Sequence, residues 1–439
     1  MAVKYITGSS ISLLFKSSSG SGREGELIFG DEVNVDASLP PVNKRVKVDA
    51  RGKPGYILHD QLGDKPALEI YFIDVGQGDA TFIVTPGRKK ILIDGGINNR
   101  AFGFLAWKYR FDRGGPPVDI DLLVLSHADG DHLNGLVPII RHPRVNVRKI
   151  IHSGIAVFRK GAFRTALGDL DSSKKYLLTR HDSLHDLDGL ALSEKFEAWR
   201  QAVAAEGMPY SAVDATTGLI DIGDPEIRLE VMGPRLDTCG GRPAYPWFGD
   251  EGQTINGHSV VFKLTYGRVA VMFPGDLNAK GAVNLLKNAA IAPGLSAHVL
   301  KAPHHGSQDF YRPFLEAVRP QISVISSGDE TDYGHPRAIF IGTIGQVSRS
   351  AQPLVFSTEL AANFVEEKTE KEERGVVKKK EALETLDTQA PDADRKGRLL
   401  YKRRLHGMIN VRTDGSFLYA ARRIAGPAAW EDYGPVGLA

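Results

Sequence analysis

Two imidazoles and two carboxylates lie within six residues in the segment LLVLSHADGDHLNG, at His127, Asp129, Asp131 and His132. They come directly after an apolar run typical of a buried strand and before a segment with the pattern of a helix. Such groups cost free energy when they stay unpaired in a partly buried loop, and one or two divalent cations would satisfy them all. The spacing therefore predicts a metal centre. A polar surface loop is the alternative, and it fits poorly with an origin at the end of so apolar a strand.

Three later apolar segments also end in residues that bind metals. VAVMFPGD ends in Asp276, AHVLKAPHH ends in His304 and His305, and ISVISSGDETDYGHP reaches His335. A carboxylate such as Asp276 can bridge two metals, and an imidazole can complete the second one. A lone histidine would be weak evidence, but four strand ends that present ligands indicate one shared site.

The hydrophobic pattern predicts the elements that position these residues. LEIYFIDV is a nearly continuous apolar run, as expected of a strand buried on both faces, and ATFIVTP and KKILIDGG follow it as two more strands. HSVVFKLTYGRVAVMF predicts a hairpin, and helices and strands then alternate. SEKFEAWRQAVAAEG predicts an amphipathic helix, because Phe196, Trp199 and Val203 are three to four residues apart.

Four regions follow along the chain. Residues 1–64 read as short strands separated by Ser/Gly and Pro clusters. Residues 68–365 contain the ligand-bearing strands and form the expected hydrolase domain. Residues 366–398 have few large apolar side chains and many charges of both signs, which predicts a flexible exposed insertion. Residues 399–425 contain a hairpin with Asp-Gly at its turn, which is expected to complete the same domain.

The stretch ELIFGDEVNVD followed by RVKVDARGKPGYILHDQL resembles a bacterial SH3-like barrel. The resemblance implies a small N-terminal β-barrel that serves as a docking module for a protein partner. A β-extension that merely packs on the rest of the chain is the alternative.

Composition excludes several classes of protein. The net charge of +2 is nearly neutral, so composition alone does not indicate nucleic-acid binding, although a metal can supply local positive charge. Cys239 is the one cysteine, which excludes an intrachain disulfide and a cysteine-rich zinc site. No apolar run is long enough to span a bilayer and no signal-peptide pattern is evident, so we expect a cytoplasmic protein with no membrane association.

Five motifs, FIDVGQGDA, LIDGG, SHADGDH, FPGD and LKAPHHGS, together resemble the metallo-β-lactamase-fold domain of ComEC, the competence DNA-uptake protein, and its free-standing relatives. The related phosphorylcholine esterases share the same framework. The resemblance implies an α/β fold, an αββα metallo-β-lactamase sandwich, and a metal-dependent hydrolase.

The resemblance also implies a ligand set. The metal ligands it implies are His127, Asp129, Asp131, His132, Asp276 and His305. Asp129 stands where the wider superfamily has a histidine, and this oxygen ligand shifts preference from Zn²⁺ toward Mn²⁺ or a mixed occupancy. Asp276 resembles the bridging aspartate of the family. Either His304 or His305 matches its late histidine ligand, with His305 favoured and His304 left for the substrate.

A second group of residues is expected to support the ligands or to contact the substrate: Gln77, Asp79, Asp94, Asn256, His258, Lys301 and Ser307. Asn256 matches an N-x-N-S element of the family, in which His258 replaces an asparagine. His258 would add an imidazole to the first metal or face the substrate. Lys301 is a candidate phosphate contact. For the remaining residues a structural role is as well supported as a chemical one.

The expected mechanism follows from two divalent metal ions, zinc or manganese, that activate a water as hydroxide for in-line attack on phosphorus. Asp131 would orient this nucleophile as well as bind metal. His304 or His335 would protonate the departing alkoxide, which is a hypothesis.

The predicted function is a metal-dependent phosphodiester hydrolase, most simply a DNA nuclease resembling ComEC-type domains, with nucleic acid as its substrate. Hydrolysis of a small phosphoester, such as a choline-phosphate ester or a cyclic nucleotide, is the second prediction. A partner-activated effector, assembled through the SH3-like module and the charged insertion, is the third. The filled ligand positions favour an active enzyme over a non-enzymatic binding protein.

Overall fold

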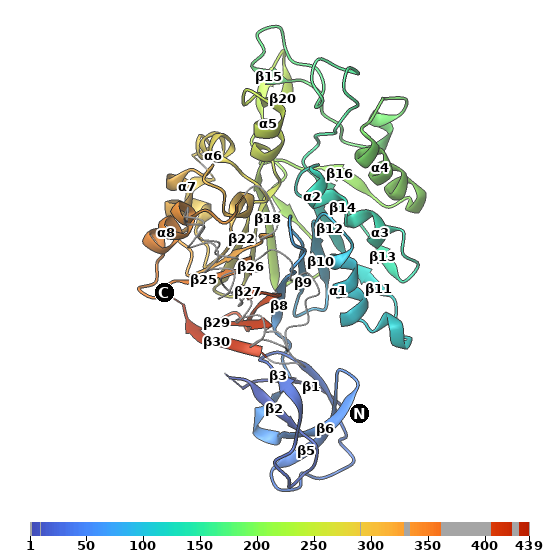
Figure 1. The fold of residues 1–439 in the computed structure, drawn as a ribbon, viewed down its shortest axis with the longest axis vertical. Helices are drawn as coiled ribbons and strands as arrows, with labels where there is room; N and C mark the ends of the chain where they lie inside the picture. Colours follow the sequence, from blue (N-terminus) through green and yellow to red (C-terminus); the bar gives the residue numbers. More distant parts are fainter. Residues whose placement is uncertain are drawn as a thin grey trace, which may run out of the picture.

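Two β-sheets packed face to face make up most of the chain from residue 68 onward, and a smaller sheet lies at one end of them (Figure 1). The computed structural model describes the chain except for residues 1, 9, 290, 329–333, 361–404, 424–429 and 439. The charged insertion predicted at 366–398 lies outside the described residues, as does part of the segment predicted at 399–425.

The first sheet of the sandwich carries the strands that follow the N-terminal region and, inserted beside them, the C-terminal hairpin. Its nine described strands are, in spatial order, β16 (Tyr210–Ala212), β14 (Ile150–His152), β12 (Leu122–Leu125), β10 (Lys90–Ile93), β9 (Thr81–Val84), β8 (Leu68–Phe72), β28 (Ile409–Thr413), β29 (Phe417–Arg423) and β30 (Trp430–Gly437). Strands β10, β12, β14 and β16 run parallel, and β28 pairs antiparallel with β8. The first strand after the N-terminal region thus pairs with a strand of the C-terminal hairpin in one sheet.

The second sheet contains the predicted hairpin at its centre. Its seven described strands are, in spatial order, β17 (Leu219–Ile220), β18 (Ile227–Gly233), β21 (Val261–Tyr266), β22 (Val269–Phe273), β23 (Val299–Lys301), β24 (Ile322–Ile325) and β25 (Leu354–Ser357). Strands β22 to β25 run parallel to one another, so their carboxyl ends lie at the same edge of the sheet.

One apolar core fills the space between the two sheets, and further cores lie outside them. Phe72 of the first sheet and Phe273 of the second have their ring centroids 6.4 Å apart across the interface. Every residue of β8 and of β22 is buried, because helices cover the outer face of each sheet. The α/β class expected from the sequence is confirmed, and the layers lie in the order helix, sheet, sheet, helix (Figure 1).

The helices divide between the two outer faces. The outer face of the first sheet is covered by α1 (Arg100–Lys108), α3 (Leu136–Ile140) and α4 (Glu194–Glu206). The outer face of the second is covered by α6 (Ala279–Leu286), α7 (Arg312–Val318) and α8 (Ala338–Val347). Two short helices, α2 (Gly130–Leu133) and α5 (Glu251–Gly257), lie at the end of the sandwich away from the N-terminal sheet (Figure 1). Across the described residues, no helix is both long and apolar enough for a bilayer span.

Helix α4 shows why the predicted amphipathic helix forms. The Ser193 side chain accepts a hydrogen bond from the backbone N–H of Phe196 at the start, and Gly207 ends the helix in the left-handed region with φ +64°. Phe196, Trp199 and Val203 are buried against the first sheet, as their spacing predicts. The prediction for this segment is confirmed.

Residues 2–63 form a separate sheet with its own small core. Its seven described strands are, in spatial order, β3 (Arg23–Leu27), β2 (Ser12–Phe15), β6 (Lys53–Leu58), β5 (Arg45–Ala50), β4 (Glu32–Val35), β1 (Ala2–Ile6) and β7 (Leu62–Gly63). Alternating burial along β5 places Val46 and Val48 in this core with Ile6 and Ile57. Short strands are present as predicted, and the SH3-like likeness and its docking role stay predictions.

Three small sheets contain the remaining described strands. They pair β11 (Val118–Ile120) with β13 (Val145–Val147), β15 (Tyr176–Leu177) with β20 (Arg242–Pro246) and β19 (Asp237–Cys239), and β26 (Glu359–Leu360) with β27 (Leu405–His406). The sheet containing β15 and β20 projects beside α5 above the end of the sandwich that carries the ligand-type residues (Figure 1).

Candidate metal centre

The predicted ligands follow strands of both sheets and meet at the end of the sandwich away from the N-terminal sheet (Figure 1). His127 comes two residues after the end of β12, Asp276 three residues after β22, and His305 four residues after β23. Because the strand ends are rigid and lie at one edge, the loops after them bring these side chains together.

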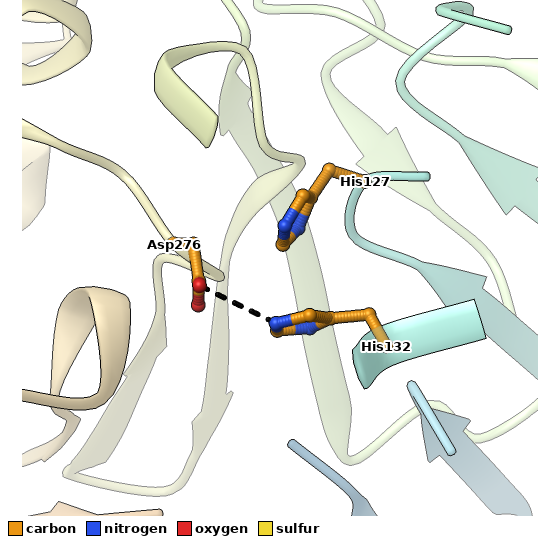
Figure 2. A group of neighbouring side chains, drawn as sticks. All are labelled: His127, His132 and Asp276. Atoms are coloured by element: carbon orange, nitrogen blue, oxygen red, sulfur yellow. Dashed lines mark ion pairs between the residues drawn. The ribbon is translucent and has the colours of Figure 1, made fainter. Parts of the chain in front are cut away.

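Five side chains converge at this edge. The Nε2 atom of His132 is 3.4 Å from Oδ2 of Asp276, and Nε2 of His305 is 3.0 Å from the same oxygen. Asp131 places Oδ2 3.5 Å from Nε2 of His305. Figure 2 shows the rings of His127 and His132, whose centroids are 4.1 Å apart, directed toward the Asp276 carboxylate. The prediction that these strand ends share one cluster agrees with this geometry.

The unsatisfied atoms of the cluster fit a divalent cation. Within the described part of the chain, Nε2 of His127, of His132 and of His305 are buried and have no hydrogen-bond partner, although Nε2 of His132 and of His305 lie at ion-pair distance from Asp276. Buried polar atoms are rarely left without a partner. Divalent cations bound to nitrogen and oxygen ligands would supply the missing partners of these nitrogens.

The electrostatics of the metal-free cluster point the same way. Burial alone would raise the pKa of Asp276, but His305 and His132 outweigh burial and hold it well below its ordinary value. Burial alone would lower the pKa of His305, but Asp276 and Asp79 outweigh it and raise it to about 10. The carboxylates therefore favour a positive charge at this place, and metal binding would release protons because a ligating imidazole is neutral.

A second set of contacts orients the imidazoles from behind. Nδ1 of His132 lies 2.8 Å from Oδ2 of Asp94, and the Ser126 hydroxyl donates to the same carboxylate oxygen over 2.6 Å. Nδ1 of His305 lies 3.0 Å from the backbone carbonyl oxygen of Ser326. Such partners select which ring nitrogen faces the metal. Asp94 was predicted as a supporting residue; Ser126 and Ser326 were not, because neither residue type signals such a role.

Lys301 is placed differently from its prediction as a phosphate contact. Its side chain is only 4% exposed, so the ammonium group is inside the cluster and away from solvent. It forms an ion pair with Asp79, lies 3.5 Å from Oδ1 of Asp276, and donates to the carbonyl oxygen of Gly275 over 3.1 Å. Lys301 therefore offsets carboxylate charge within the site.

The GQGD turn packs directly on the ligand loop. The side-chain amide of Gln77 donates to Oδ2 of Asp131 over 3.0 Å, and the backbone N–H of Asp79 lies 3.3 Å from the Asp131 carbonyl oxygen. Gly78 has φ +103°, and a Cβ atom there would come within 1.9 Å of the same carbonyl oxygen. Only glycine permits this approach, which explains the glycine of the motif.

His305, rather than His304, lies in the cluster. Both residues adopt left-handed backbone conformations, with φ 46° and 52°, in the short turn η5 (Pro303–Gly306). Such angles are costly for residues other than glycine and occur at sites where the surrounding structure enforces them. His304 is turned outward, with Nε2 3.3 Å from the side-chain nitrogen of Asn256.

His335 and His304 form the rim of the site, with ring centroids 5.9 Å apart. Burial lowers the pKa of His304, and burial followed by the charges of His305 and His304 lowers the pKa of His335 to about 4. Both rings are therefore neutral near pH 7. In this state they accept hydrogen bonds, and the predicted donation of a proton to the leaving group would require protonation first.

Asp129 lies at the open edge of the cluster. Its Oδ2 is 3.7 Å from Nε2 of His127, and its side chain is 40% exposed. A carboxylate in this position can move toward a cation bound at His127, but it is not part of the tightest group of ligand atoms.

The structure does not bring His258 or Ser307 into the cluster. His258 is fully buried, its Nε2 lies 2.9 Å from the carbonyl oxygen of Pro246, and its ring stacks on Phe248. It therefore neither adds an imidazole to a first metal nor faces the substrate, which corrects the prediction. The Ser307 hydroxyl accepts the backbone N–H of Asp309 and shapes the local turn.

Comparison with known proteins agrees with this geometry. Residues 73–233 match the model of the metallo-beta-lactamase superfamily. The matched region contains His127 to His132 but ends before Asp276 and His305, which enter the site through the fold alone.

Curated relatives are matched over part of their length. The chain is 23% identical over 283 residues to ComE operon protein 3 of Bacillus subtilis, covering 61% of this chain and 29% of that protein. It is 38% identical over 82 residues to Competence protein ComA of Neisseria gonorrhoeae, covering 18% and 12%. It is 22% identical over 316 residues to Recombination protein 2 of Haemophilus influenzae, covering 72% and 31%. The chain thus spans less than a third of the length of these relatives.

Among solved structures, a metallo-beta-lactamase variant from Cronobacter sakazakii is 15% identical and covers 53% of this chain and 75% of that chain. Its TM-score of 0.26 is too low to bear on the fold or the site.

Proposed function

Because residues 73–233 carry a domain of the metallo-β-lactamase superfamily, a family of metal-dependent hydrolases, we propose that this chain hydrolyses phosphodiester bonds and that DNA is its substrate. The observation that carries the proposal is the set of three buried, unpartnered imidazole nitrogens beside Asp131 and Asp276. The relatives named for competence and for recombination support a nucleic-acid substrate.

Two divalent cations, zinc or manganese, are the proposed cofactors. His127, His132 and Asp276 form one group of ligand atoms, and Asp131, His132 and His305 form another. His132 belongs to both groups, but one imidazole nitrogen binds only one cation. Another residue would therefore have to be the ligand that the two cations share. Asp276 suits that role because one of its oxygens lies near both His132 and His305.

The charge balance supports two cations over one. The carboxylates of Asp79, Asp94, Asp131 and Asp276 face a single ammonium group, that of Lys301. With neutral imidazoles the site therefore has a net charge of about −3, which one divalent cation would not neutralise. A site left negative would repel a phosphodiester anion.

The chemistry of the bound metals would be Lewis-acid polarisation of the phosphoryl group and a lowered pKa for water. Asp131, held by the amide of Gln77, would orient the attacking water. His304 and His335, neutral at the rim, would accept hydrogen bonds from the substrate or the incoming water. Lys301 would keep Asp79 and Asp276 in place as charge develops.

The test is metal content measured together with cleavage of plasmid, single-stranded DNA, RNA and bis-p-nitrophenyl phosphate in Mn²⁺ and in Zn²⁺. We expect bound metal and DNA cleavage in the wild type, and loss of cleavage in Asp131→Ala. Asp64→Ala, at an exposed carboxylate of the N-terminal sheet, is the matched control and should behave as wild type.

Two results would count against the proposal. Cleavage of the chromogenic ester alone would favour a small phosphodiester as the substrate. A wild-type chain that retains no divalent metal would overturn the hydrolase mechanism itself.

A further inference from the structure

A large cavity is lined by residues of both the N-terminal sheet and the sandwich. The N-terminal sheet lies at the end of the sandwich opposite the metal centre (Figure 1). The volume of the cavity is about 1180 Å³, enough for a nucleotide-sized ligand. One wall comes from the turn between β5 and β6, another from the end of α1 and the residues after it, and a third from the end of β29. None of the residues used in the proposed hydrolysis lines it.

Two guanidinium groups from these walls lie over one aromatic ring, and a third lies beside Gly52 in the same cavity. The guanidinium carbon of Arg51 is 5.9 Å from the ring centroid of Trp107, and that of Arg423 is 5.0 Å from it. The Arg110 guanidinium lies against Gly52, where an added Cβ atom would come within 2.0 Å of it. Trp107 itself is 41% exposed, although it is a large apolar residue.

This gathering of positive charge is only partly compensated. Arg51 pairs with Asp31, but among the described residues the side chains of Arg110 and Arg423 have no hydrogen bond or ion pair. Arg51 and Arg423 lie over the same ring, so their like charges repel each other. Burial and then the charge of Arg51 lower the pKa of Arg423 accordingly.

Three of the six acidic residues that line the cavity are already engaged in ion pairs elsewhere. Asp31 also binds Arg412, Glu32 binds Arg88, and Glu69 binds Lys108. They cannot turn to Arg110 or Arg423 without leaving another buried or half-buried charge alone. An anion that enters the cavity would relieve the repulsion at no such cost.

We propose that this cavity binds a polyphosphate anion through Arg51, Arg110 and Arg423, with Trp107 as its apolar wall. Guanidinium groups match phosphate oxygens with paired hydrogen bonds, and three of them suit a ligand with several negative charges. The bound anion bridges the N-terminal sheet, through Arg51, and the sandwich, through Arg110 and Arg423. This site does not depend on the proposed phosphodiesterase function.

The test uses the full chain with its metals removed by a chelator that is then dialysed away, so that the metal centre cannot hold phosphate. Inorganic pyrophosphate and ATP are titrated separately, and binding is followed by calorimetry and by the melting temperature. We expect saturable binding of at least one probe and a higher melting temperature. Tighter binding of ATP would identify a nucleotide, and equal binding would identify the polyphosphate chain alone.

Variants assign the binding to the cavity. Arg110→Gln and Arg423→Gln should each weaken binding about tenfold or more, because each removes charged hydrogen bonds to the anion. Arg242→Gln, at an exposed arginine on β20 outside the cavity, should leave binding unchanged. Circular dichroism checks that each variant is folded, and within the described chain neither Arg110 nor Arg423 has a hydrogen bond or ion pair whose loss would destabilise the fold.

The proposal is overturned if neither probe binds saturably, or if binding survives both cavity substitutions. Equal weakening in Arg242→Gln would also overturn it, because the interaction would then be a general attraction to positive charge.

Discussion

The sandwich has a buried cluster of charged side chains at each end, and the two clusters differ in how completely they are paired. At the metal centre, Nε2 of His127, of His132 and of His305 has no hydrogen-bond partner in the described chain. At the opposite end, Arg412 is fully buried and its guanidinium donates to the carbonyl oxygen of Phe29 and to other buried groups. The first cluster therefore contains nitrogens that a metal could bind, whereas the charges of the second are paired within the protein.

The paired cluster joins the N-terminal sheet to the sandwich. Arg412 on β28 donates to Oδ1 of Asp31 over 2.9 Å and to the hydroxyl of Tyr71 over 3.1 Å. Lys108 donates to Glu69 over 3.1 Å and to the same hydroxyl over 2.7 Å. Each charge has a partner of opposite sign, so this cluster needs nothing from solution. Buried polar atoms without a hydrogen-bond partner, rather than buried charge itself, therefore indicate a binding site.

The largest effect is expected when a ligand of the metal centre is removed. His132→Ala should lower hydrolysis by more than about a thousandfold and reduce bound metal, since the substitution deletes a nitrogen ligand of the catalytic group. The melting temperature should match that of the metal-free wild type. Turnover, elemental analysis and thermal unfolding measure the three quantities. A variant as unstable as one in the paired cluster would mean that His132 is structural.

Removing Arg412 should lower the stability of the fold and leave turnover unchanged, the reverse of what is expected for His132→Ala. Arg412→Met removes one of the two cations that pair with each of the buried carboxylates of Asp31 and Glu69, and leaves them only Arg51 and Lys108. The substitution should lower the free energy of unfolding by about 3 kcal/mol. Turnover per folded molecule should be retained, because the metal centre is at the other end. Denaturant unfolding measures the change. Arg312→Met, which breaks an exposed pair with Glu316, is the control and should cost no more than about 1 kcal/mol.

Asp94 tests the role of the residues that orient the ligands of the metal centre. Asp94→Asn should weaken metal binding about 10–100-fold, because Asp94 orients the ring of His132. Competition with a chromophoric chelator measures the affinity. Asp119→Asn, at an exposed carboxylate, should leave it unchanged. Unchanged affinity in Asp94→Asn would show that the ring is held without this contact.

The smallest expected effect is a pH dependence of the paired cluster. Burial alone would raise the pKa of Asp31, but Arg51 and Arg412 outweigh it and lower the pKa from 3.8 to about 2. Since the folded-state pKa is depressed, the stabilisation is present above about pH 4 and is lost as pH falls through about 2. The difference corresponds to about 2 kcal/mol.

Unfolding of wild type and Asp31→Asn between pH 6 and pH 2 tests this. The wild type should lose its advantage over the variant as the pH falls. A constant difference between the two proteins across that range would contradict the assignment.

The sequence predicted more of the metal centre than of the paired cluster. The HADGDH segment and the later strand ends were readable because their residue types are typical of metal ligands and each follows an apolar run. The paired cluster gave no such signal, because Asp31 and Arg412 are separated by 381 residues and nothing in the two segments that contain them predicts their pairing. The sequence did not predict the large cavity beside the paired cluster either, since the walls of the cavity come from three segments that are far apart in the chain.

By itself, the sequence determined the α/β class, the main strands and the positions of the ligand-type residues after them, because hydrophobic periodicity is a local property of the chain. The tertiary structure alone decided which side chains reach the centre. His305 turns inward and His304 outward through left-handed backbone angles, His258 is buried against Phe248, and Lys301 lies among carboxylates. These outcomes depend on packing between segments far apart in sequence, and no local pattern encodes the direction of a side chain.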